Sequence, residues 1–248
     1  MNRLSRTVLT ALVLCAPLVA HTSSAQPQPP RLERSETPPA PAAAPAGCIP
    51  ATPTADQVVN CVQAVYDKSQ TFGSDFSQRF WVKAYNQEKS SHGHVTFVKP
   101  GKMHWSYDDE QSRGNRVVSD GATIKVYEAN NKQMYEQPME KSQYPAALSF
   151  LTGTGKLSDS FNFELFPGEQ MKFPGGLVLV GTPKTPTPAY SKVLFYVDTG
   201  TANVRRAMII DAQGNRNRFD FETPKINEPI PPELFRYTPP AGTSIIHP

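Results

Sequence analysis

Several features are scarce in this chain, and their absence excludes whole classes of protein. Only three of the 248 residues are cysteine and no Cys-x-x-Cys pair occurs, which argues against a thiol redox motif or a cysteine zinc site. The formal net charge is only +3, so there is no electrostatic footprint for nucleic acid. Apart from one run near the N-terminus, no stretch is long and apolar enough to form a transmembrane helix.

Groupings of catalytic residues are also missing. His92 and His94 would share one face of a strand, but no third metal ligand accompanies them. The acidic residues 108–110 are contiguous, whereas the carboxylates of a glycosidase face each other across a cleft. No Ser-His-Asp or Cys-His arrangement stands out. We therefore expect a protein that is not an enzyme and that has no metal and no cofactor.

The one long apolar run lies at the N-terminus. Arg3 and Arg6 precede the run 8–20, and small residues follow it up to Ala25. This layout is typical of a cleaved secretory signal, which we assign to residues 1–25. Cleavage of this signal removes two arginines and lowers the formal net charge of the chain from +3 to +1. A retained membrane anchor is the alternative, although the run is short for one.

The remaining cysteines, Cys48 and Cys61, form an even pair in a chain that we expect to be exported. Such a pair predicts a disulfide, here between the segment before the first helix and that helix. An acylated lipoprotein cysteine is not expected. Leu14 occupies the position before Cys15 where a small residue is needed, and Cys48 lies far downstream of the apolar run.

Composition divides the exported part into two regions. Residues 26–54 are rich in Pro and Ala and poor in apolar bulk, which predicts a disordered tether. Residues 55–248 suit one domain with a single core. The domain opens with a helix that Thr54 or Asp56 can cap and that Phe72-Gly73 is expected to end. Its apolar residues at helical spacing are Val58, Val59, Val62, Val65 and Tyr66.

Most of the domain alternates between apolar and polar residues, which is the period of a strand. Met103, Trp105 and Tyr107, for example, share one face of such a segment. Short helical segments are expected only at 145–151 and 156–160. Because no βαβ alternation is present, we expect a curved antiparallel sheet with too few helices to cover both of its faces. Helices over the concave face would enclose an apolar cavity.

Six stretches also carry a family resemblance through their order and spacing. They are residues 72–78, 93–105, 118–121, 127–128, 148–153 and 235–242. Together they extend over about residues 56–246, and they resemble the periplasmic outer-membrane lipoprotein carrier family, LolA. The resemblance implies an incomplete antiparallel β-barrel of about ten or eleven strands, covered by the N-terminal helix and a short helical insertion.

The resemblance also implies a function. A LolA-type protein acts in the periplasm, where it shields the acyl chains of lipoproteins and carries them from the inner to the outer membrane. Its expected partners are acylated lipoproteins, an inner-membrane lipoprotein-releasing ABC transporter of the LolCDE type and an outer-membrane receptor of the LolB type. We expect a monomer without nucleic-acid partners.

Site residues follow from the same resemblance. The family often has Arg directly before the Pro after the second strand, where it binds the lid backbone, and this chain has Lys99 there. Met103 stands where an aromatic residue is frequent. A solvated cation at Lys99 and ordinary core packing at Met103 and Trp105 are the alternatives. The expected lining of the acyl-chain cavity is Phe80, Phe97, Met103, Trp105, Ile124, Leu148, Leu151 and Phe163.

Other functions remain open at this stage. The same fold can bind or sense another amphiphile, such as a glycolipid or a pigment, because apolar pockets read shape loosely. A lipid-anchored outer-membrane lipoprotein receptor would need an acylated N-terminal cysteine, which the sequence does not favour. A hydrolase is the weakest alternative because no catalytic grouping was found.

Overall fold

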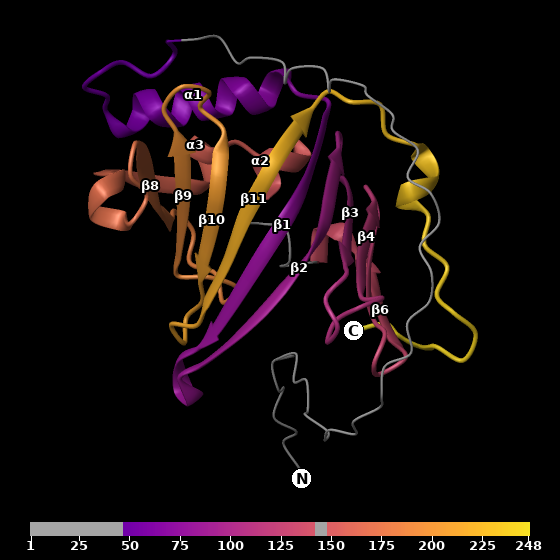
Figure 1. Cartoon of the computed structure of the whole chain (residues 1–248). Helices are drawn as coiled ribbons and strands as arrows, with labels where there is room; N and C mark the ends of the chain where they lie inside the picture. Colours follow the sequence, from indigo (N-terminus) through magenta and orange to yellow (C-terminus); the bar gives the residue numbers. More distant parts are fainter. Residues whose placement is uncertain (1–46, 142–147) are drawn as a thin grey trace, which may run out of the picture. The chain divides into compact units, whose positions relative to one another are not determined.

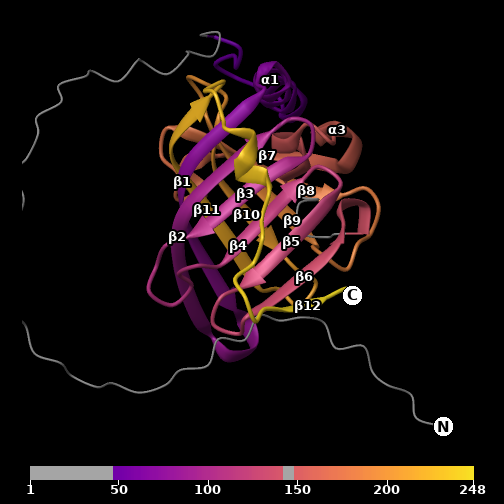
Figure 2. The same cartoon turned by 90° about the vertical axis from the view of Figure 1, so that its right-hand side faces the viewer.

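A single open sheet dominates the fold. The computed structural model describes residues 47–141 and 148–248, so the expected signal peptide and most of the expected tether lie outside the described residues. Twelve strands follow the order β12-β6-β5-β4-β3-β2-β1-β11-β10-β9-β8-β7, and β12 and β7 form the two edges. This confirms the predicted mainly β, open-sheet fold class. Figures 1 and 2 show how the sheet curls, with β4–β6 on one side of the interior and β9–β11 on the other.

The strands have the following bounds: β1 (Thr71–Val82), β2 (Gln87–Val98), β3 (Lys102–Tyr107), β4 (Arg116–Asp120), β5 (Thr123–Glu128), β6 (Gln133–Pro138), β7 (Phe161–Pro167), β8 (Gly176–Pro183), β9 (Lys192–Asp198), β10 (Val204–Ile210), β11 (Arg216–Ile226) and β12 (Ser244–Ile246). Neighbouring strands are antiparallel except for β12, which pairs with β6 in parallel. Only three residues form β12, so the period-2 pattern of the sequence did not indicate it.

Helix α1 (Ala55–Lys68) begins where the sequence predicts. Thr54 caps it, and the Thr54 and Gln57 side chains form a reciprocal capping box. The predicted end was wrong, because the helix stops at Lys68, and Phe72 and Gly73 belong to β1. Ser69 terminates the helix, since its backbone N–H donates to the Tyr66 carbonyl at 3.1 Å and its hydroxyl donates to the same carbonyl at 2.7 Å.

Two short helices stand beside α1 at the same end of the sheet (Figure 1): α2 (Ser149–Thr152) and α3 (Leu157–Ser160). α3 falls within the predicted segment 156–160, whereas α2 overlaps the predicted segment 145–151 and ends one residue beyond it. Residues 145–147 of the first prediction lie outside the described residues. The 3-10 segments are η1 (Lys83–Tyr85), η2 (Met139–Lys141), η4 (Gly168–Met171) and η5 (Pro232–Phe235). Among the described residues, no helix combines the length and apolar character needed to cross a membrane.

The predicted disulfide is present between Cys48 and Cys61. Cys61 is buried on α1, whereas Cys48 belongs to the exposed segment before the helix. The bond therefore ties the start of the described chain to α1.

The sheet has an inner face, which is turned towards the helices, and an outer face. The inner side chains form the main hydrophobic core together with α1, α2 and α3. On the outer face, Val178, Leu194 and Tyr196 form a second, smaller cluster beside η4. The C-terminal segment after η5 covers another part of the outer face, where the Tyr237 ring lies 5.6 Å from that of Tyr127. Helices α1, α2 and α3 therefore cover the inner face, whereas η4 lies beside the outer cluster.

Candidate functional site

A connected layer of aromatic rings lines the inner face. Rings on different strands make edge-to-face contacts: the Phe76 and Trp105 ring centroids are 4.9 Å apart, and those of Phe97 and Trp105 are 5.8 Å apart. It continues onto the helices, because the ring of Phe150 on α2 lies 4.9 Å from that of Tyr66 and 5.1 Å from that of Phe195. The side chains of sheet and helices thus form one apolar interior.

Burial varies along this interior. Beside the helices, the inner side chains are almost fully covered; Phe97 is 1% exposed and Phe195 is 0% exposed. Other apolar side chains that pack on the same core are only partly buried, among them Tyr107, Val126, Leu165 and Ile209. The interior is therefore less completely covered by protein at these side chains.

Lys99 joins the sheet to the helices. Its ammonium donates a hydrogen bond to the carbonyl of Tyr66, in the last turn of α1. A cation in that position also interacts favourably with the negative end of the helix dipole. Burial lowers the pKa of the Lys99 ammonium, and the nearby Asp67 carboxylate acts in the opposite direction. The residue that the resemblance points to as a lid contact thus reaches α1.

Short polar contacts attach the other two helices. The N–H of Gly101 donates to the carbonyl of Thr152 on α2 at 3.0 Å, and the N–H of Leu157 on α3 donates to the side chain of Gln63 on α1 at 2.9 Å. The aliphatic stem of Lys99 lies against Gly153, where a Cβ atom would approach its Cδ within 2.7 Å. Lys99 consequently contacts the C-terminal ends of both α1 and α2.

Tyr66 attaches the last turn of α1 to the sheet. Its side chain is 0% exposed, and its hydroxyl accepts a hydrogen bond from the N–H of Val204 at 3.1 Å. Burial raises the pKa of this phenol well above its usual value. Tyr66 therefore anchors α1 through its hydroxyl, while its carbonyl receives Lys99.

Seven of the eight residues predicted to line the cavity belong to this apolar interior or pack against it. Phe97, Met103, Trp105, Ile124, Leu148 and Leu151 are buried in the main core. Phe163 is partly buried and packs against that core. Phe80 is partly buried and opposes Asn217 on β11, but it packs on neither hydrophobic cluster. The structure thus groups seven of the predicted residues around one interior, and their part in binding acyl chains is taken up as a proposal below.

Several interior residues escaped the sequence prediction. Phe76, Phe150, Phe195 and Phe219 make ring contacts that link the predicted residues to one another. Two of these residues could have been predicted from the sequence. Phe219 alternates with polar neighbours, and Phe195 lies in the apolar run of β9. Tyr66 was recognised only as an apolar position of the helix, since nothing local in the sequence identifies its carbonyl as the partner of Lys99.

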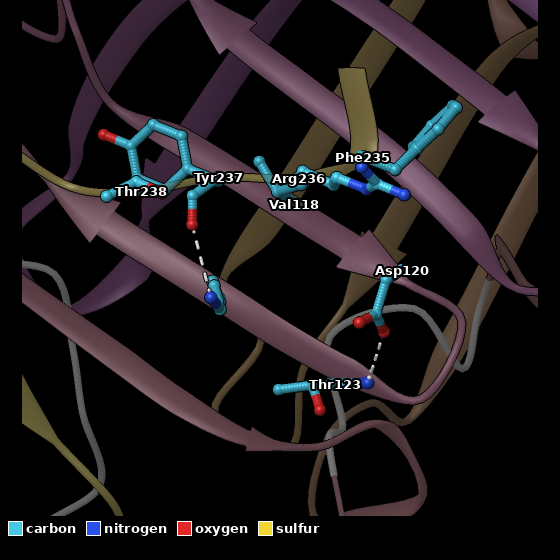
Figure 3. Close-up of a pocket in the computed structure, with 8 residues that line it drawn as sticks. Val118, Asp120, Thr123, Phe235, Arg236, Tyr237 and Thr238 are labelled. Atoms are coloured by element: carbon cyan, nitrogen blue, oxygen red, sulfur yellow. Dashed lines mark hydrogen bonds between the residues drawn. The ribbon is translucent and has the colours of Figure 1, made fainter. Parts of the chain in front are cut away.

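A separate cavity of about 220 Å³ lies on the outer face, beneath the C-terminal segment (Figure 3). Phe235 and Val118 provide apolar surface, while Arg236 and Asp120 provide charge. The ammonium of Lys125 closes one side by donating to the carbonyl of Tyr237 at 3.2 Å. Its small size and charged lining distinguish this cavity from the aromatic interior on the other face of the sheet.

Histidines lie on the outer face. The imidazole of His94 contacts the carboxylate of Asp75 at 2.9 Å, while His104 on the neighbouring strand is partly buried. Burial lowers the pKa of His104 to about 4, and the charges of Arg116 and His94 add to this effect. Within the described ranges, no three His, Cys, Asp or Glu side chains are grouped so that they could hold a metal ion.

An open, curled antiparallel sheet whose aromatic inner face is covered by short helices defines a half-barrel protein with an apolar interior. The model of the family "Outer membrane lipoprotein carrier protein LolA" matches residues 67–238. The chain belongs to this LolA family.

Relatives with the same description resemble the chain over most of their length. An outer-membrane lipoprotein carrier protein from Nitrosospira multiformis is 26% identical over 189 residues, which cover 76% of this chain and 87% of the relative. One from Pseudomonas fluorescens is 28% identical over 184 residues, with coverage of 73% and 83%.

Solved structures with related folds are more distant. A LolA superfamily protein from Nitrosomonas europaea superposes with a TM-score of 0.44 at 14% identity and covers 75% of this chain and 99% of its own. An uncharacterized conserved protein from Thermus thermophilus superposes with a TM-score of 0.48 at 12% identity, with coverage of 78% and 99%.

Proposed function

We propose that this protein is a periplasmic carrier that shields the acyl chains of lipoproteins in the interior between the sheet and helices α1–α3. The observation that carries the proposal is the aromatic inner face, which continues onto helices held by a few polar contacts. Membership of the LolA family supports the same function.

The physical need for such an interior is large. Each methylene exposed to water costs about 0.8 kcal/mol, so one long acyl chain costs on the order of 10 kcal/mol. A lipoprotein cannot cross an aqueous compartment freely at that cost. Binding between sheet and helices removes the chain from water without covalent chemistry, and movement of the helices then permits release.

The carrier needs a donor and an acceptor of its cargo. We propose that it receives lipoproteins from an inner-membrane ABC transporter of the LolCDE type and delivers them to the outer membrane, through a receptor of the LolB type. We further propose that residues 1–25 direct export to the periplasm and that the carrier acts as a monomer. The predicted lining residues would contact the acyl chains, and Lys99 would act as the lid latch.

Two adjacent isoleucines offer a matched test. Ile209 packs on the inner core, whereas Ile210 packs in the outer cluster, and both are partly buried. In Ile209→Glu the carboxylate lies at the margin of the proposed site, so release of lipoproteins from spheroplasts should fall at least tenfold, because a charge at an apolar contact carries a large desolvation cost. Ile210→Glu should release lipoproteins at nearly the parental rate.

The purified periplasmic protein provides an independent measurement. Mass spectrometry of the bound material should identify acylated lipoproteins, and the Ile209→Glu variant should carry much less of them. Equal release by the two glutamate variants, or recovery of a glycolipid or pigment in place of lipoproteins, would contradict the proposed function.

A further inference from the structure

The indole N–H of Trp105 lies inside the apolar interior without an acceptor. The side chain is 1% exposed, and its Nε1 atom has no hydrogen-bond partner in the described part of the chain. Buried tryptophans usually find such a partner, because an unmet donor loses its hydrogen bonds to water and gains nothing in return. This polar atom is therefore anomalous within an otherwise apolar lining.

The surroundings of Trp105 explain why the donor stays unmet. The rings of Phe76, Phe219 and Phe97 have centroids 4.9, 5.2 and 5.8 Å from its own, and none of them carries an oxygen. On the neighbouring strand β4, Ser119 opposes Met103, and its hydroxyl is already engaged: it donates to the carbonyl of Gly101 at 3.2 Å and accepts from the N–H of Gly121 at 3.0 Å.

Trp105 also occupies an intermediate depth. On β3 it stands between Met103, which is 1% exposed beside the helices, and Tyr107, which is only partly buried. In the register of the sheet, it opposes Val117, which in turn opposes the partly buried Val126. A ligand that enters past Tyr107 and Val126 meets the indole before it reaches the helix end of the interior.

We infer that Trp105 donates a hydrogen bond to an acyl carbonyl of the cargo. The inference rests on the proposed function, since an acyl chain bound in this interior brings a carbonyl oxygen at its head. The flanking aromatic rings contact methylene groups, while the N–H recognises the one polar atom that distinguishes an acyl chain from an alkyl chain. Of the two buried side-chain polar atoms without partners among the described residues, Trp105 Nε1 is a donor and Asn203 Oδ1 is an acceptor.

The second tryptophan of the chain provides a control. The sequence contains two tryptophans, and Trp81 lies on β1 near the β1–β2 turn, where its Nε1 donates to the side chain of Asn86 at 3.2 Å. The guanidinium of Arg216 stacks on its ring. Trp81→Phe therefore removes an indole N–H from the protein without changing the interior.

The experiment compares two synthetic lipopeptides of equal chain length, one with two fatty acyl esters and one with two alkyl ethers, against the mature protein. The parent and Trp81→Phe should bind the diester about tenfold more tightly than the diether, which is the effect of one buried hydrogen bond. Trp105→Phe keeps an aromatic ring and should bind the two lipopeptides equally. In a proton–nitrogen NMR spectrum of the parent, the Trp105 indole signal should move downfield with the diester and not with the diether.

The outcomes separate the inference from the function on which it rests. Equal binding of the two lipopeptides by the parent, or a preference that survives in Trp105→Phe, would overturn the role of Trp105 and leave the carrier function intact. Binding of neither lipopeptide would overturn both. If Trp105→Phe does not fold, the indole signal of the parent alone decides, because it reports the hydrogen bond directly.

Discussion

Replacement of Lys99 by Met tests how firmly the helices are held. Met keeps the length of the side chain but removes the ammonium that donates to the Tyr66 carbonyl. That carbonyl still accepts from the backbone N–H and the hydroxyl of Ser69, at 3.1 and 2.7 Å, so it is not left unpaired. The loss is then about 1 kcal/mol for the hydrogen bond and about 0.3–1 kcal/mol for the cation at the helix end.

The total of about 1–2 kcal/mol corresponds to a factor of roughly five to thirty in the equilibrium between closed and open helices. Partial exposure of Lys99 to solvent screens its charge and favours the lower part of this range. The empty closed state competes with cargo, so weaker closure should strengthen cargo binding by the same factor. Lys99→Met should therefore retain lipoproteins and transfer them to acceptor membranes more slowly.

Amide hydrogen exchange measures closure directly. In the empty protein, protection of the amides of α1 should fall by roughly five- to thirtyfold, while β9 and β10 change little. Lys102→Met is the control, because it removes a lysine from the first residue of β3, three positions from Lys99, and the Lys102 side chain makes no hydrogen bond or ion pair among the described residues. Gly153→Ala should reproduce the effect, since its Cβ would displace the Lys99 stem and its backbone has φ +70.

Unchanged protection of α1 in Lys99→Met would refute this reasoning. So would an equal loss in Lys102→Met, because the effect would then be one of net charge. Faster transfer of lipoproteins by Lys99→Met would show that closure holds the cargo in place, which contradicts competition between the closed state and cargo.

Two further predictions concern stability. The double replacement of Cys48 and Cys61 by Ser opens a disulfide with a sequence separation of 13 and should lower the free energy of unfolding by about 2–3 kcal/mol in urea titrations; two free thiols in the exported parent would contradict the bond. The pKa of His104 is lowered to about 4 in the folded protein, so the unfolded chain binds more protons between pH 4 and 6.5 and stability falls as the pH drops through that window. His104→Gln should flatten this part of a plot of melting temperature against pH, and an unaltered slope would exclude His104 as its source.

Local patterns in the sequence specify much of the fold. Thr54 and Gln57 mark the start of α1 because a capping box depends only on residues three positions apart. The end of α1 was misplaced because Gly73 resembles a helix terminator, whereas in the structure it pairs with Thr96 and Lys225 inside the sheet. Whether a glycine ends a helix or allows a strand to bend depends on strand partners that lie far away in the sequence.

The candidate site shows the same division between local and distant information. Alternation places Met103 and Trp105 on one face of β3, and that face is indeed buried. The alternation of apolar and polar residues cannot predict how deeply each side chain is buried, because its burial depends on which helix packs over it. Nor can it pair Lys99 with the carbonyl of Tyr66, since a backbone carbonyl has no signature in a sequence. The family resemblance pointed to Lys99, and the structure supplies the carbonyl of Tyr66 as its hydrogen-bond partner.

The packed interior bears on how a carrier can both bind and release. Phe97, Trp105 and Phe195 are already covered by protein in the closed structure, so an incoming acyl chain exchanges ring–ring contacts for ring–methylene contacts. The gain per methylene on binding is therefore smaller than the roughly 0.8 kcal/mol of full transfer from water. In a membrane, the acyl chain gains the full free energy of transfer from water, because no protein helices have to be displaced. The affinity of the carrier is then a difference between two apolar environments, and a few polar contacts such as that of Lys99 are large enough to tune it.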